Sequence, residues 1–149
     1  MNELLINLFL TFILTGAIGV EREINGSSGG LRTHILVGLG TFGMMMAGFL
    51  MAANLQGSLD PTRITGSIIQ GIGFLGAGSI LKMKESVSGL TTASSIWTVC
   101  AIAILCSLKM FQIAILITFA ALFTLVILRW IEWKMDTKKR RKEQNKCYN

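Results

Sequence analysis

Acidic side chains are missing from the interior of every long apolar stretch of this 149-residue sequence. Its 8 Asp and Glu residues lie at the ends of those stretches or between them. A pathway for Mg²⁺ or another divalent cation needs several hard oxygen ligands that meet inside the protein. One copy of the chain lacks the side chains for such a pathway, so a cation channel would require an oligomer that brings several copies together.

Histidine, cysteine and proline are scarce as well, with 1 His, 3 Cys and 1 Pro. These residues assemble neither a Cys–His or Ser–His–Asp arrangement nor a metal-ligand spacing. Cys100 and Cys106 lie on different faces of one predicted helix, and Cys147 lies in a predicted cytosolic tail, so we expect no disulfide framework. The sequence therefore predicts a protein that is not an enzyme and has no metal site and no cofactor.

Long uncharged apolar segments make up most of the sequence, in which 52% of the residues are hydrophobic and only 15% are charged. A helix needs about 20 apolar residues, and at least about 17, to cross a bilayer. Helices of this length also bond all their backbone groups internally, as lipid demands. We predict an all-α integral membrane protein, a five-helix transmembrane bundle that occupies residues 1–133, followed by a basic tail over 134–149. The predicted helices cover residues 4–20, 35–53, 61–81, 90–108 and 110–131.

The distribution of basic residues predicts the orientation of this bundle. Seven of the 14 Lys and Arg residues follow Trp133, and residues 134–149 carry +5 of the total charge of +6. Positive charge is retained on the cytoplasmic side, so we expect the C-terminus inside and, after five crossings, the N-terminus outside. A basic tail at this position contacts anionic lipid. It does not interleave basic with aromatic side chains as RNA-binding segments do, so we expect no nucleic-acid partner.

A run of glycines marks the third predicted helix. Gly71-x-Gly73-x-x-Gly76 matches a dinucleotide-binding fingerprint, but no strand precedes it, as that fingerprint requires. Small residues instead let helices approach closely in lipid. At about 100° per residue, Gly71 and Gly78 lie on one face and Gly73 and Gly76 on the opposite one. We therefore predict a central helix clamped between two neighbours.

The start of the third predicted helix and one tryptophan of the fourth also have predicted structural roles. Asp60 followed by Pro61 is a strong helix start, with Asp60 as the N-cap and Arg63 in the first turn. Trp97, in the fourth predicted helix, is expected to pack against a face of glycines.

Charged and hydroxyl side chains gather at the predicted cytoplasmic face. Glu21 and Glu23 end the first helix, where the helix dipole disfavours negative charge, so both should have partners. Arg22 points about 100° away from its neighbour on a helix, whereas Arg32 and His34 fold back across a glycine-rich turn. The second and fourth helices begin at this face and present free N–H groups there. The candidate cluster comprises Glu21, Arg22, Glu23, Arg32, Thr33, His34, Thr91 and Thr92.

Two interpretations of this cluster remain open. In the first, it is a closed network of ion pairs and helix caps that locks the helix ends, because charged groups near a membrane usually pair with one another. In the second, it is a binding site for an acidic partner, a phosphate or a regulatory ligand. His34 is either a hydrogen-bonded structural residue or a group that senses pH near neutrality.

The motifs resemble those of the MgtC/SapB family of bacterial membrane proteins. The matching segments, in the order and spacing of the family, are Gly19–Glu23, Gly30–His34, Asp60–Arg63, Gly71–Gly78 and Gly89–Ala93 with Trp97. The resemblance implies a bacterial inner-membrane protein linked to adaptation to low magnesium and to virulence. It also implies that the protein modulates a membrane-protein partner, notably the F-type ATP synthase. A cation transporter or channel that acts as a homo-oligomer is the alternative.

The resemblance covers the transmembrane part of that family. Many members carry a soluble regulatory domain after the last helix, and in this sequence the basic tail takes that place. The resemblance therefore does not extend to regulation through such a domain.

Overall fold

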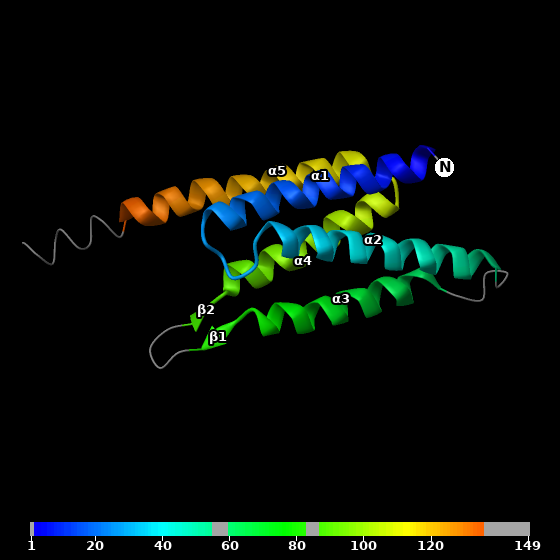
Figure 1. Ribbon diagram of the computed structural model, residues 1–149, viewed down its shortest axis with the longest axis horizontal. Coiled ribbons are helices and arrows are strands. Elements are labelled where there is room, and N and C mark those ends of the chain that lie inside the picture. The colour runs from blue at the N-terminus through cyan, green and yellow to red at the C-terminus, as the bar shows by residue number, and fades with distance from the viewer. Residues whose placement is uncertain (1, 55–59, 83–86, 136–149) are drawn as a thin grey trace, which may run out of the picture.

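The fold is a bundle of long helices with one short hairpin (Figure 1). The computed structural model describes residues 2–54, 60–82 and 87–135. The helices are α1 (Asn2–Ile24), α2 (Leu31–Asn54), α3 (Pro61–Gly78), α4 (Leu90–Ser107) and α5 (Phe111–Phe123). After α5 the chain continues through the π-helix η1 (Thr124–Leu128) and stays helical to residue 135. Strands β1 (Leu81–Lys82) and β2 (Val87–Ser88) pair antiparallel between α3 and α4.

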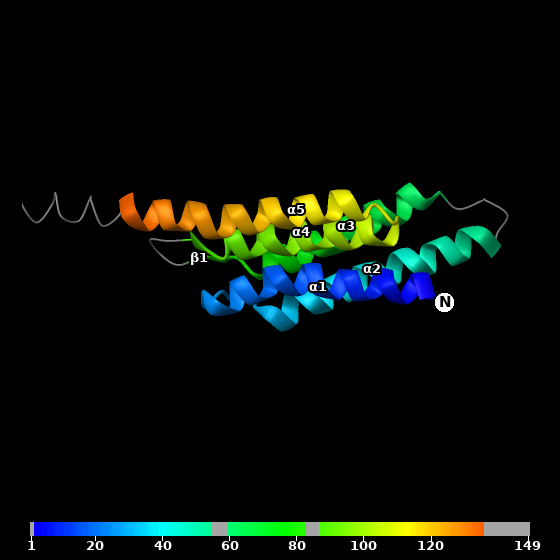
Figure 2. The ribbon, with the colours of Figure 1, turned by 90° about the horizontal axis from the view of Figure 1, so that it is seen from above.

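Successive helices run antiparallel in both views (Figures 1 and 2). The C-terminal ends of α1, α3 and α5 therefore meet the N-terminal ends of α2 and α4. We call this end of the bundle the Glu21 end. It is the end at which the sequence predicts the charged cluster to gather.

Four of the helices are long and apolar enough to cross a membrane, which confirms a helical integral membrane protein. They are α1, α2, α4 and the 25-residue segment formed by α5 with its continuation. The helix α3 is not among them, because its 18 residues include Arg63, Gln70 and several glycines. The helices α1 and α2 extend past both predicted ends by a few residues, since a helix continues into charged residues once its apolar part is embedded. The helix α4 begins as predicted and ends at Ser107, one residue before its predicted end.

The central helix is α4, and the prediction of a central glycine-rich helix is wrong. The helix α4 packs against α1, α2, α3 and α5, and it buries Val99, Ile102 and Ala103 completely. In contrast, α3 lies at the edge of the bundle against α4 and α2 (Figure 1). It turns Ile68 and Ile72 inward. Its glycines lie mostly on the other faces, because the branched side chains bury more apolar surface.

Only one of the four predicted packing glycines of α3 is in close contact with another helix. Gly76 is buried, and a Cβ built on it would lie 3.7 Å from the Cβ of Ala93 in α4. Gly71 borders a groove between α2 and α3. A Cβ on Gly73 or Gly78 would meet no atom within 4 Å. The helix also ends at Gly78 rather than at residue 81, because the Ser79 hydroxyl bonds the Gly76 carbonyl at 2.7 Å and the chain then enters β1.

The helices α1 and α2 approach each other closely through glycines of their own. A Cβ on Gly19 would lie 2.9 Å from the backbone Cα of Leu31, and one on Gly38 would lie 2.6 Å from Thr15 Cγ2. The small-residue packing expected in lipid therefore joins the first two helices. This close approach positions the start of α2 against the end of α1.

The predicted start of α3 is confirmed. The Asp60 carboxylate accepts a hydrogen bond of 2.9 Å from the Thr62 backbone N–H, and Asp60 has the extended backbone of an N-cap. This bond favours the ionised carboxylate and so lowers the pKa of Asp60. Trp97 is 53% exposed, and its packing against a face of glycines stays a prediction.

Candidate functional site

A buried ion pair occupies the Glu21 end of the bundle. Arg22 Nε donates to Glu21 Oε2 at 2.5 Å and Arg22 Nη2 donates to Oε1 at 2.8 Å. The two side chains are only 6% and 9% exposed. Asn25 Nδ2 donates to the same carboxylate at 2.5 Å and to the Glu21 carbonyl at 2.9 Å. A two-pronged pair of this kind fixes the guanidinium in direction as well as in charge.

The partner of Glu21 is therefore Arg22, and the expectation that Arg32 folds back across the turn to this cluster is wrong. Arg32 is exposed and makes no ion pair with any residue in the described ranges. The close contact of Gly19 with Leu31 and His34 turns those two residues of α2 toward α1. Arg32, between them in sequence, consequently points away from the carboxylate.

Glu23 caps the second helix. Its Oε2 accepts a hydrogen bond of 2.9 Å from the Leu31 backbone N–H, a group that has no partner within α2. A Cβ on Gly30 would collide with this carboxylate oxygen, so only glycine leaves room for it. The expectation that both acidic residues at the end of α1 have partners is thus confirmed.

His34 ties α2 to the central helix. The side chain is completely buried, its Nδ1 lies 2.8 Å from the Gly30 carbonyl oxygen and its Nε2 lies 2.9 Å from Ser95 Oγ. A carbonyl only accepts, so Nδ1 carries the proton in this contact. The Ser95 hydroxyl also lies 2.8 Å from the Thr92 carbonyl, so its single proton serves either His34 or Thr92. These contacts are those of a structural residue, while a pH-sensing role stays a prediction.

The three threonines of the cluster lie in different surroundings. Thr92 is buried, and its Cγ2 would lie 2.9 Å from a Cβ on Gly29, so the turn before α2 packs directly on α4. Thr33 is half-buried beside the same turn. Thr91 is exposed and lines a pocket that no motif of the sequence indicates.

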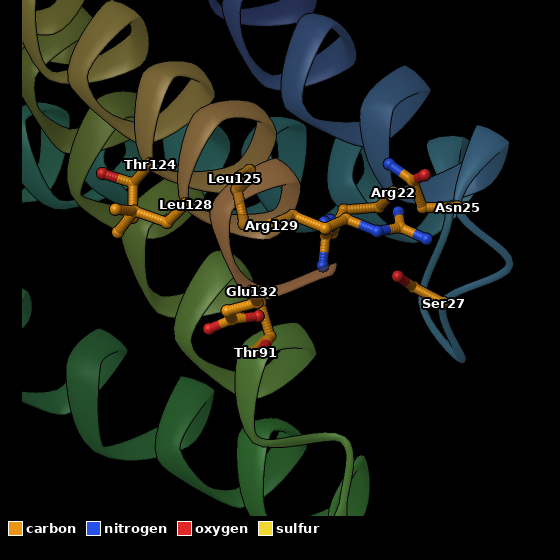
Figure 3. Close-up of a pocket in the computed structure, with 9 residues that line it drawn as sticks. All are labelled: Arg22, Asn25, Ser27, Thr91, Thr124, Leu125, Leu128, Arg129 and Glu132. Carbon is orange, nitrogen blue, oxygen red and sulfur yellow. The ribbon is translucent and has the colours of Figure 1, made fainter. Parts of the chain in front are cut away.

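This pocket, which we call the arginine pocket, lies between α1, α4 and the helical segment formed by η1 and the residues after it, and has a volume of about 350 Å³ (Figure 3). It is lined by Arg22, Asn25, Ser27, Thr91, Thr124, Leu125, Leu128, Arg129 and Glu132. Arg129 and Glu132 were missed because the sequence shows them only as charges beside the interfacial tryptophans. Their place depends on the π-helix η1, for which the sequence gives no signal.

The charged cluster and the helices that carry it are shared with a known protein family. The model of the MgtC family matches residues 8–134. This range contains the whole charged cluster and all the helices apart from the first turns of α1. The chain belongs to the MgtC family. As a member with four helices apolar enough to span a bilayer, it is a multi-pass protein of the bacterial inner membrane.

Several curated MgtC-family relatives are similar over most of this chain. It is 39% identical over 130 residues to "Putative magnesium transporter YhiD" of Escherichia coli K12, covering 85% of this chain and 59% of the relative. It is 36% identical over 129 residues to "Protein MgtC" of Salmonella typhimurium LT2, covering 87% of this chain and 54% of the relative. The chain thus spans a little more than half the length of these relatives. No solved structure matches it significantly.

The charged cluster and the arginine pocket offer ion pairs, helix caps and a polar cavity rather than a ligand set for a metal. Among residues 2–54, 60–82 and 87–135, no group of three or more His, Cys, Asp or Glu side chains is placed to hold a metal ion. What the arrangement provides chemically is a fixed guanidinium, a second arginine and hydroxyls around a small cavity.

Proposed function

We propose that this protein is a non-enzymatic regulator that binds another protein within the membrane and acts in adaptation to low magnesium. Membership of the MgtC family and the names of its relatives support the link to magnesium. The observation that carries the regulatory role is the outer face of α3. It is the surface of the bundle best suited to a further helix.

The outer face of α3 consists of residues spaced so that they share one side of the helix at about 100° per residue. Its members are Gly66, Gln70, Gly73 and Ala77, and all four are exposed. Small residues with open space beside them allow a second helix to approach closely, which is the main source of helix association in lipid. The amide of Gln70 adds a polar group whose exposure to hydrocarbon is costly unless another protein group bonds it.

The proposed partner is the F-type ATP synthase, as the family resemblance implies. We expect Gly73→Leu to weaken recovery of the partner by about tenfold, because a bulky side chain there holds the two backbones apart. The measurement is co-purification from native membranes after mild crosslinking, with the recovered proteins identified by mass spectrometry. Gly40→Leu is the matched control, since Gly40 in α2 is also exposed and has open space around it.

The outcomes of this experiment separate the claims. Equal recovery with both variants would exclude the outer face of α3 as the binding surface. A stoichiometric partner other than the ATP synthase would retain the regulatory role and reject the synthase. The absence of any partner of the wild-type protein would reject regulation by binding.

We also propose that α3 is a fifth membrane crossing, with the N-terminus outside and the C-terminus in the cytoplasm. The antiparallel course of all five helices supports an odd number of crossings (Figure 1). The excess of basic residues after Trp133 supports the orientation. We expect an alkaline phosphatase fused after Asn149 to be inactive and a fluorescent protein there to be bright. An active phosphatase would reverse the orientation.

Cation transport by an oligomer is the second candidate, favoured by the name of the YhiD relative. The bundle interior also contains a set of buried side-chain oxygens. They belong to Asn7, Thr11, Thr15, Thr41, Ser95, Ser107 and Thr118. Several donate to carbonyls of their own helix, as Thr11 does to Asn7 at 2.8 Å. Neutral hydroxyls without carboxylates are a weak ligand set for a divalent cation. Flux of Mg²⁺ into proteoliposomes that requires this protein would favour transport over regulation.

A further inference from the structure

The arginine pocket combines a rigid guanidinium with a second arginine that has no acidic partner. The bonds to Glu21 use Nε and Nη2 of Arg22 and leave Nη1 for another group. Arg129 forms no ion pair with any residue of the described ranges. The lining thus contains two guanidiniums and one carboxylate, that of Glu132. Because Glu21 offsets Arg22, the positive charge left for a ligand is that of Arg129. Glu132 on the same wall reduces this charge, although the two side chains form no ion pair in the described part of the chain.

Neutral donors complete the wall of the pocket around the two arginines. The hydroxyls of Ser27 and Thr91 both line it, from the turn after α1 and from the first turn of α4 (Figure 3). Arginine and hydroxyl donors of this kind match the oxygens of a phosphate group. A carboxylate has two acceptor oxygens and a carbonyl group has one. A phosphate group has more, so it can accept hydrogen bonds from more of the donors in this wall.

The π-helix η1 brings Arg129 into this position. A π-helical turn holds one more residue than the α-helical turn it replaces, so it rotates everything after it relative to the bundle. The helix η1 ends at Leu128, which lines the pocket, and Arg129 follows directly. Such turns often mark functional sites, because they sacrifice regular hydrogen bonding to aim a side chain.

Two tryptophans beside the pocket indicate that it lies at the depth of lipid headgroups. Trp130 and Trp133 directly follow the lining residues Arg129 and Glu132 in the sequence, and their side chains are 58% and 68% exposed. Lys134 sits over the Trp130 ring at 4.9 Å from its centre. Exposed tryptophans of this kind mark the interface between hydrocarbon and water, where phosphate groups are most concentrated.

We propose that the arginine pocket binds a phosphate group, supplied by the headgroup of an anionic phospholipid or by a soluble phosphate. Arg129 provides the charge, and Arg22, held by Glu21, provides a preset donor. Glu132 weakens the site by repulsion. This site does not depend on the role proposed for α3, which lies on another side of α4.

The test measures the unfolding midpoint of the full-length protein in neutral detergent. One arm adds short-chain phosphatidylglycerol, with phosphatidylcholine as its control, and the other adds inorganic phosphate, with chloride at matched ionic strength. A ligand that binds the folded state raises the midpoint with its concentration. A response to phosphatidylglycerol identifies the headgroup as the source, and a response to phosphate identifies the soluble ion. No response in either arm would overturn the proposal.

Variants assign the response to the pocket. Arg129→Gln should weaken the apparent affinity at least about tenfold, whereas Arg63→Gln, which removes the same charge at the opposite end of the bundle, should leave it unchanged. Both arginines are exposed, so neither change threatens the fold. Glu132→Gln should bind several-fold more tightly because it removes a repulsive charge. Equal effects of the two arginine variants, or weaker binding by Glu132→Gln, would overturn the assignment.

Discussion

Replacing Gly89 with alanine is expected to destabilise the protein by more than about 3 kcal/mol, an exceptionally large effect for a single methyl group. Gly89 precedes α4 with a left-handed backbone, φ +90° and ψ −4°. This conformation costs an L-residue about 1–2 kcal/mol. The added Cβ would also collide with the carbonyl oxygen of Ser79 and lie 3.2 Å from Ile80 Cα. Both obstacles are backbone atoms, so no side-chain rotation relieves the clash.

The measurement for Gly89→Ala is the unfolding midpoint in detergent, followed by tryptophan fluorescence. Gly26→Ala is the matched control, because Gly26 also has a positive φ, +63°, but nothing lies within 4 Å of its Cβ position. We expect the control to cost only about 1 kcal/mol, the strain of the backbone alone. If the two variants lost equal stability, the tight contact between the end of α3 and the start of α4 would not hold.

Replacing Glu21 with glutamine is expected to cost about 3–5 kcal/mol, because it leaves the buried guanidinium of Arg22 without a counter-charge. Glutamine keeps the size of the side chain and one carbonyl oxygen, so the loss reflects charge rather than volume. The pair is less than a tenth exposed, and water therefore cannot replace the carboxylate. Unfolding in detergent by a chemical denaturant measures the change.

Two comparisons make the Glu21 prediction specific. Glu3→Gln removes the exposed ion pair with Lys109 and should barely change stability, since solvent screens such pairs. The double variant Glu21→Gln with Arg22→Met should recover most of the loss, because it no longer buries an unpaired charge. A double variant as unstable as Glu21→Gln alone would show that the ion pair is not the cause.

The sequence predicted the helices and their ends well wherever a local signal existed. Long uncharged stretches gave four helices that can span a membrane, and the Asp60–Pro61 pair marked the start of α3. The helix dipole correctly implied partners for Glu21 and Glu23. These predictions succeeded because each depends on residues a few positions apart in the chain.

Other features escaped prediction because they depend on which helices become neighbours. The glycines of α3 indicated close helix packing but did not show which helix would be the partner. The structure places α3 at the edge of the bundle, and Gly19 and Gly38 pack α1 closely against α2. Helical geometry suggested that Arg32 folds back to the charged cluster, but the close approach at Gly19 turns Arg32 outward. The family match was recognisable from the motifs alone, whereas Arg129 belongs to none of them.

The sequence by itself determined that this chain is a helical membrane protein with its charged groups at the ends of the helices, since hydropathy and charge act on each segment separately. Only the tertiary structure decided that α4 is central, that Glu21 and Arg22 are buried as a pair, and that Arg129 and Arg22 line the same pocket. Those facts follow from the fit of branched side chains and glycines between helices distant in sequence, and no single segment contains that information.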